Sequence, residues 1–141
     1  TFFFFYLARG RGCPMTLTAM GCYKDYRGKR VLPNLIMNQR GTDGFMANYT
    51  SELPSCATKA KEMGYKYIGI QYYGECWAGD HFASPLKEKR SCIDLKFRTC
   101  QKMGSHRICS GKEWTNFIYG LQEYKTYRIH TCEEKVTPES K

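Results

Sequence analysis

The chain has 141 residues, eight cysteines and a net charge of +9. This length suits one domain with a modest core, and an even number of cysteines with no Cys-x-x-Cys pair favours disulfides over a zinc site. The three histidines lie far apart in the sequence, so we expect no metal ion, and no motif indicates a cofactor.

The cysteines and the charge also indicate a compartment and a class of partner. Cytosolic proteins of this size rarely carry eight cysteines, and Asn48-Tyr49-Thr50 is a glycosylation sequon, so we expect a secreted, extracellular protein. A positive net charge favours acidic partners such as sulfated glycans. The extracellular location argues against nucleic acid, and a merely solvated basic surface is the alternative.

An apolar run opens the chain. Residues 1–8 read TFFFFYLA and precede Arg9-Gly10-Arg11-Gly12, which resembles the end of a signal peptide. A short edge strand or an artefact of the chain's preparation are the alternatives. The run is too short to span a bilayer and no other stretch is long enough, so we expect no transmembrane segment in this chain. Residues 1–20 are predicted to be an apolar remnant and linker.

The next predicted elements are a loop and a helix. Residues 38–50 are rich in Asn, Gly, Asp and Thr and predict a loop. Thr50 or Ser51 is expected to cap the helix that follows, with Pro54 in its first turn and Gly64 at its end. One apolar face recurs at helical spacing; its residues are Leu53, Cys56, Ala57, Ala60 and Met63.

A strand follows the helix directly. Residues 65–73 are rich in aromatic and β-branched side chains, and residues 75–79 continue this strand into a turn. Gly69 in mid-strand indicates close approach of the helix, or a bulge. The rest of the chain predicts a basic loop at 80–91, a short apolar strand at 115–121, a last strand within 122–131 and a disordered end.

Several short motifs then match one family in order along the chain. They are Gly21-Cys22-Tyr23-Lys24-Asp25, Arg30-Val31-Leu32, Cys56-Ala57, Gly64-Tyr65, Tyr67-Ile68-Gly69-Ile70, Glu75-Cys76-Trp77-Ala78-Gly79, Cys92, Cys100, Cys109-Ser110-Gly111 and Ile118-Tyr119. The chain resembles a WSC domain, a cysteine-rich extracellular module related in shape to PAN/apple domains. We therefore expect the domain at residues 21–121, followed by a strand-like extension and tail at 122–141. The expected fold is a small disulfide-rich α+β domain, PAN/apple-like, with one helix packed on an antiparallel sheet and long loops.

One departure from the family pattern supports the alignment. Family members usually carry a further cysteine one turn along the helix and another two residues after the strand cysteine, where this chain has Ala60 and Ala78. Those two positions would be joined by one bridge, and both cysteines are absent together. The resemblance implies the pairs Cys22–Cys92, Cys56–Cys76 and Cys100–Cys109. Cys13 and Cys132 lie outside the module and are left for each other.

The resemblance implies non-catalytic recognition of an extracellular glycan, neutral or sulfated, since WSC domains are generally described as glycan binders. Apolar faces of sugar rings stack on aromatic side chains, and polar neighbours fix their orientation. The aromatic candidates are Tyr72, Tyr73, Trp77 and Trp114. Packing in the core or sheet is the alternative for all four, and Trp77 could simply cover a disulfide.

Basic side chains offer a second mode of binding. Arg27, Lys29 and Arg30 lie in one turn, and Lys87, Lys89 and Arg90 lie in one loop. If these clusters converge in space they could bind sulfate or carboxylate groups by charge-assisted hydrogen bonds. If they do not converge, they are ordinary solvated charge.

Enzymatic activity is not expected. No spacing singles out a pair of carboxylates for acid–base chemistry, and the chain has no Gly-x-Ser-x-Gly, His-Glu-x-x-His or phosphate-binding loop. A module for protein–protein interaction or adhesion, as a unit of a larger protein, is the alternative to glycan recognition. A large contiguous apolar surface would favour that alternative.

Overall fold

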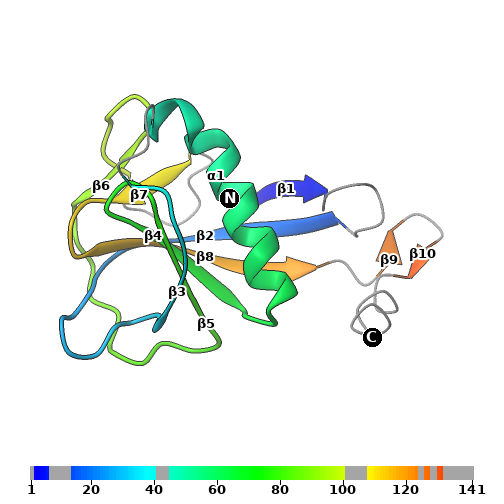
Figure 1. Ribbon diagram of the computed structural model, residues 1–141, viewed down its shortest axis with the longest axis horizontal. Helices are drawn as coiled ribbons and strands as arrows, with labels where there is room; N and C mark the ends of the chain where they lie inside the picture. The colour runs from blue at the N-terminus through cyan, green and yellow to red at the C-terminus, as the bar shows by residue number, and fades with distance from the viewer. Residues whose placement is uncertain are drawn as a thin grey trace.

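The computed structural model describes residues 2–6, 14–40, 45–100, 108–123, 126–127 and 130–131. Within these residues a single helix packs on a six-stranded antiparallel sheet whose strand order is β1-β2-β8-β4-β5-β3 (Figure 1). The elements of this layer pair are β1 (Phe2–Tyr6), β2 (Pro14–Lys24), β3 (Asn34–Asn38), α1 (Phe45–Glu62), β4 (Tyr67–Gln71), β5 (Glu75–Gly79) and β8 (Thr115–Glu123). Two short antiparallel pairs complete the described part, β6 (Cys92–Asp94) with β7 (Cys109–Gly111) and β9 (Thr126–Tyr127) with β10 (His130–Thr131).

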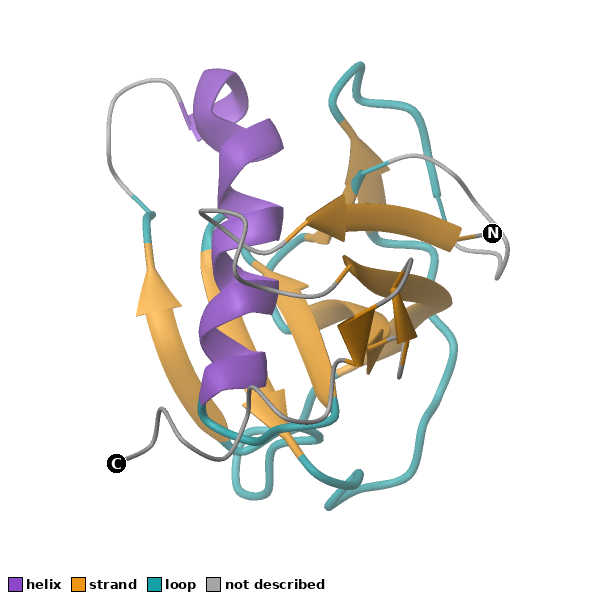
Figure 2. Cartoon of the chain, turned by 90° about the vertical axis from the view of Figure 1, so that its right-hand side faces the viewer, coloured by secondary structure: helices purple, strands orange, loops and turns teal. Residues whose placement is uncertain are grey.

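The helix covers one face of the sheet (Figures 1 and 2). Period-two alternation along the strands sends every second side chain toward the helix, and burial of these apolar groups stabilises the layer pair. The buried side chains of this face are Leu17, Ala19, Ile68, Ile70, Ala78, Phe117 and Tyr119 from the sheet, and Leu53, Ala57 and Ala60 from the helix. The small disulfide-rich α+β domain that the sequence predicts is therefore confirmed.

Loops cover the opposite face of the sheet. Val31, Leu32 and Ile118 are fully buried there, and partly buried aromatic side chains such as Trp77 and Phe82 pack against them. The chain between β2 and β3 and the long segment after β5 supply most of these contacts. Because loops rather than a second helix close this face, polar side chains of the loops reach the end of the sheet.

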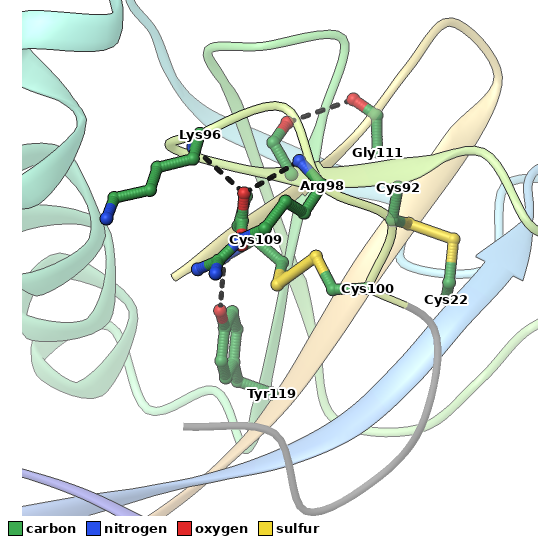
Figure 3. Close-up of a disulfide and its surroundings, with 10 residues drawn as sticks. Cys22, Cys92, Lys96, Arg98, Cys100, Cys109, Gly111 and Tyr119 are labelled. Atoms are coloured by element: carbon green, nitrogen blue, oxygen red, sulfur yellow. Dashed lines mark hydrogen bonds and ion pairs between the residues drawn. A yellow bond between two sulfur atoms is a disulfide. The ribbon is translucent and has the colours of Figure 1, made fainter. Parts of the chain in front are cut away.

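Three disulfides tie the layers together: Cys22–Cys92, Cys56–Cys76 and Cys100–Cys109. These are the pairs that the family resemblance implies. Cys56–Cys76 joins the helix to β5, and the other two bridges lie side by side where Cys100 N donates to Cys92 O at 3.0 Å (Figure 3). Cys13 and Cys132 lie outside the described residues.

The helix is longer than the sequence predicts. It begins at Phe45, within the segment 38–50 assigned to a loop, so Pro54 lies inside it and not in its first turn. Proline removes one hydrogen bond donor from the helix, and the packing of the buried residues around it supports the helix despite this loss. Gly64 follows the helix with a φ of +89°, the left-handed conformation expected of its end.

The sheet also extends beyond the expected module. Strand β2 begins at Pro14, and β1 (Phe2–Tyr6) pairs with it at the edge of the sheet. The apolar run at the start of the chain therefore includes an edge strand, which is one of the alternatives that the sequence offers. Gly69 is approached by Asn116 and Leu32, and not by the helix. A Cβ at this glycine would lie 2.7 Å from Asn116 Oδ1 and 3.2 Å from Leu32 Cδ1.

Glu52 on α1 provides a first testable prediction. Its side chain is buried, and its Oε2 atom has no hydrogen-bond partner among the described residues. Desolvation therefore raises the pKa of Glu52 from 4.5 to about 7. Between these two pH values the folded protein keeps a proton that the unfolded chain has released. Stability should fall as the pH rises through this interval and level off above it.

We expect Glu52→Gln to remove this dependence of the protein's stability on pH. Each unit of raised pKa costs about 1.4 kcal/mol of stability above both pKa values, so at pH 8 the variant should be about 3 to 4 kcal/mol more stable than the parent. At pH 4 the two proteins should differ little. Urea denaturation at both pH values measures the difference, and parallel pH profiles for the two proteins would contradict it.

Candidate functional site

An open hollow of about 410 Å³ lies at one end of the sheet, where β2 and β4 end and β8 begins. It is lined by Lys24, Asp25, Tyr72, Tyr73, Lys89, Ser91, Lys112, Glu113, Trp114 and Thr115. These residues come from four segments that are distant in the sequence. The antiparallel pairing of β8 with both β2 and β4 brings the ends of those strands together.

Three aromatic residues of the hollow have left-handed backbones. The φ angles are 51° for Tyr72, 63° for Tyr73 and 57° for Trp114. Bulky side chains rarely adopt this conformation, which costs on the order of 1 to 3 kcal/mol at each position. Residues 72–73 therefore form a turn between β4 and β5, and the strand predicted over 65–73 ends at Gln71.

Backbone contacts hold these residues in place. Tyr73 N donates to Ser110 Oγ at 3.1 Å, which fastens the turn after β4 to strand β7. Trp114 O accepts a hydrogen bond from Asp25 N at 2.9 Å, which fastens the start of β8 to the end of β2. Strained residues persist only where their surroundings over-determine them, and such residues cluster at recognition and active sites.

Asp25 forms a buried polar centre beside the hollow. Its side chain is inaccessible to solvent, and Oδ1 accepts from the backbone N–H groups of Tyr26 and Val31, each at 2.9 Å. Oδ2 accepts from Arg30 Nη1 at 2.8 Å and from Gln71 Nε2 at 3.0 Å. Four donors thus satisfy this carboxylate, which joins the loop 25–31 to the end of β4.

Arginine side chains stack on the aromatic rings around the hollow. The Arg30 guanidinium lies 4.3 Å from the ring centre of Trp77 and 4.4 Å from that of Trp114, the two tryptophans of the chain. Arg27 also lies over the Trp114 ring, at 5.1 Å. Arg40 stacks on Tyr72 at 3.7 Å. Cation–π contacts of this kind contribute about 0.5 to 2 kcal/mol each.

Glu75 connects the two groups of stacked rings. Its Oε1 atom accepts a hydrogen bond from Trp77 Nε1 at 3.0 Å, and its Oε2 atom forms an ion pair with Arg40 at 3.1 Å. A continuous series of contacts therefore runs from Trp114 through Arg30 and Trp77 to Tyr72 on the other side. These contacts restrict the rings that border the hollow.

The structure brings together most of the aromatic candidates from the sequence. Tyr72, Tyr73 and Trp114 line the hollow directly, whereas Trp77 lies behind it and contacts Trp114 through Arg30. Sequence alternation placed Tyr72 and Tyr73 in a strand, because nothing in their residue type indicates a left-handed turn.

The structure brings only some of the basic candidates to the hollow. Arg27 and Arg30 contact Trp114, but Lys87 and Arg90 do not line the hollow, and Lys89 between them does. Lys87 contributes its backbone instead, where its carbonyl accepts a hydrogen bond from Lys24 N at 2.8 Å. Lys89 belongs to the basic loop cluster that the sequence indicates, whereas sequence reasoning missed Lys24 and Lys112, because their proximity to it arises from long-range contacts. Asn48 lies in the first turn of α1, and its side chain is outside the described residues.

Among the described residues, no cluster of three His, Cys, Asp or Glu side chains has the geometry to hold a metal ion. The helix in this part of the chain lacks the apolar length needed to cross a membrane.

Comparisons of the chain with protein-family models, with curated proteins and with solved structures find no match. The functional argument therefore depends on the residues of the hollow, the disulfides and the order of the sequence motifs.

Proposed function

We propose that this chain is a non-catalytic, extracellular glycan-recognition module of the WSC type, with a PAN/apple-like fold. The order of its motifs along residues 21–121 supports the family assignment, as does the coincidence of three disulfides with the implied pairs. Disulfides form and persist in oxidising compartments, which supports a secreted location.

The observation that carries this proposal is the gathering of Tyr72, Tyr73 and Trp114, all with left-handed backbones, around one open hollow. Aromatic rings stack on the C–H faces of sugars, and the lysine, serine and threonine groups of the same hollow can bind hydroxyl or anionic substituents.

The carboxylates of the hollow support a binding role without catalysis. Glycoside hydrolysis generally uses a pair of carboxyl groups, one on each side of the scissile bond. Asp25 and Glu113 are the carboxyl groups that line the hollow. Asp25 is fully engaged with four donors, so Glu113 is left without a catalytic counterpart there.

Trp114→Ala tests the proposal. We expect the variant to weaken binding to the best ligand of a glycan array at least tenfold, about 1.4 kcal/mol, because it removes the largest ring of the hollow. Phe97→Ala is a matched control, since Phe97 is also an aromatic residue with positive φ and is 69% exposed, but lies outside the hollow.

The array should contain neutral and sulfated polysaccharides, with the oxidised protein applied at low and at physiological salt. Equal losses for the two variants would show that Trp114 is not part of the site. Absence of binding to every glycan would overturn the proposal in favour of a protein-interaction module.

A further inference from the structure

We propose that the sugar bound in this hollow carries a sulfate or carboxylate group, and that Lys24, Lys89 and Lys112 bind that group. This inference rests on the proposed glycan recognition and specifies its ligand. It separates two modes that the sequence leaves open, stacking on a neutral sugar and pairing with an anionic one.

The charge of the hollow favours an anion. Lys24, Lys89 and Lys112 all line it, and none of them is ion-paired within the part of the chain that the structure describes. Asp25 offers them no free charge because it is buried against Arg30 and three further donors. Glu113 is the other acidic residue of the lining, so the hollow keeps an excess of positive charge. Unpaired like charges held together repel one another, and an anionic ligand would relieve this repulsion.

The fold itself holds the three lysine segments together. Lys24 N donates to Lys87 O at 2.8 Å, and Lys89 N donates to Cys22 O at 3.1 Å, so the end of β2 pairs with the segment 87–89. Lys112 N donates to Ser91 O at 2.8 Å, which joins the third lysine to the same segment.

The Cys22–Cys92 disulfide locks this arrangement between β2 and the residues just after Ser91. The backbones of three lysines from distant parts of the sequence are thus held around one space before any ligand binds, and the Lys24 ammonium lies 5.2 Å from the centre of the Tyr26 ring. Such preorganisation reduces the entropy lost on binding.

The stacked arginines also favour an anionic sugar. The rings of Trp114 and Tyr72 are already in contact with guanidinium groups, from Arg27 and Arg30 in the first case and Arg40 in the second. Arg30 and Arg40 are ion-paired with Asp25 and Glu75, so Arg27 is the arginine of this group that adds positive charge to the border of the hollow, where its N–H donors suit sulfate and carboxylate oxygens.

Binding of short oligosaccharides tests the inference. The probes are a sulfated tetrasaccharide, its desulfated form, a uronic acid tetramer and a neutral glucan tetramer, each titrated into the oxidised full chain. We expect the sulfated or uronic probe to bind and the neutral glucan to bind at least tenfold more weakly. Comparison of the sulfated and uronic probes identifies which anionic group is recognised. Raising the salt concentration should weaken binding, since the exposed charges are screened.

A pair of triple variants separates local recognition from net charge. K24Q/K89Q/K112Q should weaken binding of the anionic probe at least thirtyfold, or about 2 kcal/mol. The control K59Q/K66Q/K96Q removes the same charge from exposed lysines outside the hollow and should change binding less than threefold. Equal thermal midpoints for the two variants establish that both are folded.

Three results would overturn the inference. Equal binding of the neutral and anionic probes, unaffected by the site variant, would leave glycan recognition standing and remove its anionic specificity. Equal losses for the two triple variants would show that net charge attracts the ligand without a site. If no oligosaccharide binds under any condition, the proposed function fails together with this inference.

Discussion

Replacing Asp25 by alanine is expected to lower the free energy of unfolding by about 3 to 5 kcal/mol. The substitution removes a carboxylate that is inaccessible to solvent and leaves two backbone N–H groups, the Gln71 amide and the Arg30 guanidinium without their acceptor. A donor left unsatisfied in a buried site loses its hydrogen bond with no compensation from water. Urea denaturation monitored by far-UV circular dichroism measures the change.

Asp94→Ala is the matched control for this prediction. Asp94 is also buried and accepts hydrogen bonds from the backbone N–H groups of Lys96 and Arg98. Its ion-pair partner Arg98 is 58% exposed, whereas the side chain of Arg30 is 27% exposed. Water can therefore replace more of the contacts that Asp94→Ala removes, and we expect this variant to lose about 1 to 2 kcal/mol of its free energy of unfolding. Equal costs for the two variants would contradict the central role of Asp25.

Tryptophan fluorescence gives the Asp25 variant a second measurement. Arg30 lies between the rings of Trp77 and Trp114, and Asp25 holds its guanidinium at 2.8 Å. These are the two tryptophans of the chain, so the intrinsic emission reports on this contact directly. We expect Asp25→Ala to alter the emission of the folded protein, and an unchanged spectrum would show that Arg30 stays in place without its partner.

Local patterns in the sequence predict much of the fold. Alternation along residues 67–71 and 115–121 identifies strands β4 and β8, and helical spacing of Leu53, Ala57 and Ala60 identifies the buried face of α1. The beginning of the helix could not be predicted in the same way. Residues 38–50 contain many loop-forming types, and their polar character outweighed the apolar Phe45 and Met46.

The candidate site is predicted less well, because it depends on long-range pairing and unusual backbone angles. Tyr72 and Tyr73 resemble strand residues by type, but Ser110 and Gly111 hold the backbone of Tyr73 in a left-handed turn. The lysines of the hollow lie far apart in the sequence, at positions 24, 89 and 112. They are brought together by the pairing of β2 with β8 and by the backbone hydrogen bonds that join segment 87–91 to β2 and to Lys112.

Replacing Cys22 and Cys92 with alanine removes their disulfide, and we expect this change to lower the free energy of unfolding by a similarly large amount. The bridge spans 70 residues, and the chain-entropy model assigns such a loop about 4 kcal/mol of stability. The Cys100–Cys109 bridge spans 9 residues and should contribute about 3 kcal/mol. Both pairs are fully buried, so the two double variants remove the same atoms from similar surroundings. Thermal and urea denaturation compare their costs, and an equal or reversed order would argue against loop length as the cause.

Ligand binding distinguishes the two bridges further. Cys22 and Cys92 flank the contacts that position Lys89 and Lys112, since Lys89 N donates to Cys22 O and Lys112 N donates to Ser91 O. Loss of this bridge frees the segment 87–91 from β2, and we expect at least a tenfold loss of affinity for an anionic oligosaccharide at a temperature where the variant is still folded. The Cys100–Cys109 variant should keep its affinity within about threefold, because neither cysteine lines the hollow and this bridge does not join β2 to the segment after residue 87. Equal affinities for the two variants would mean that the strand pairing alone assembles the three lysines, without help from the disulfide.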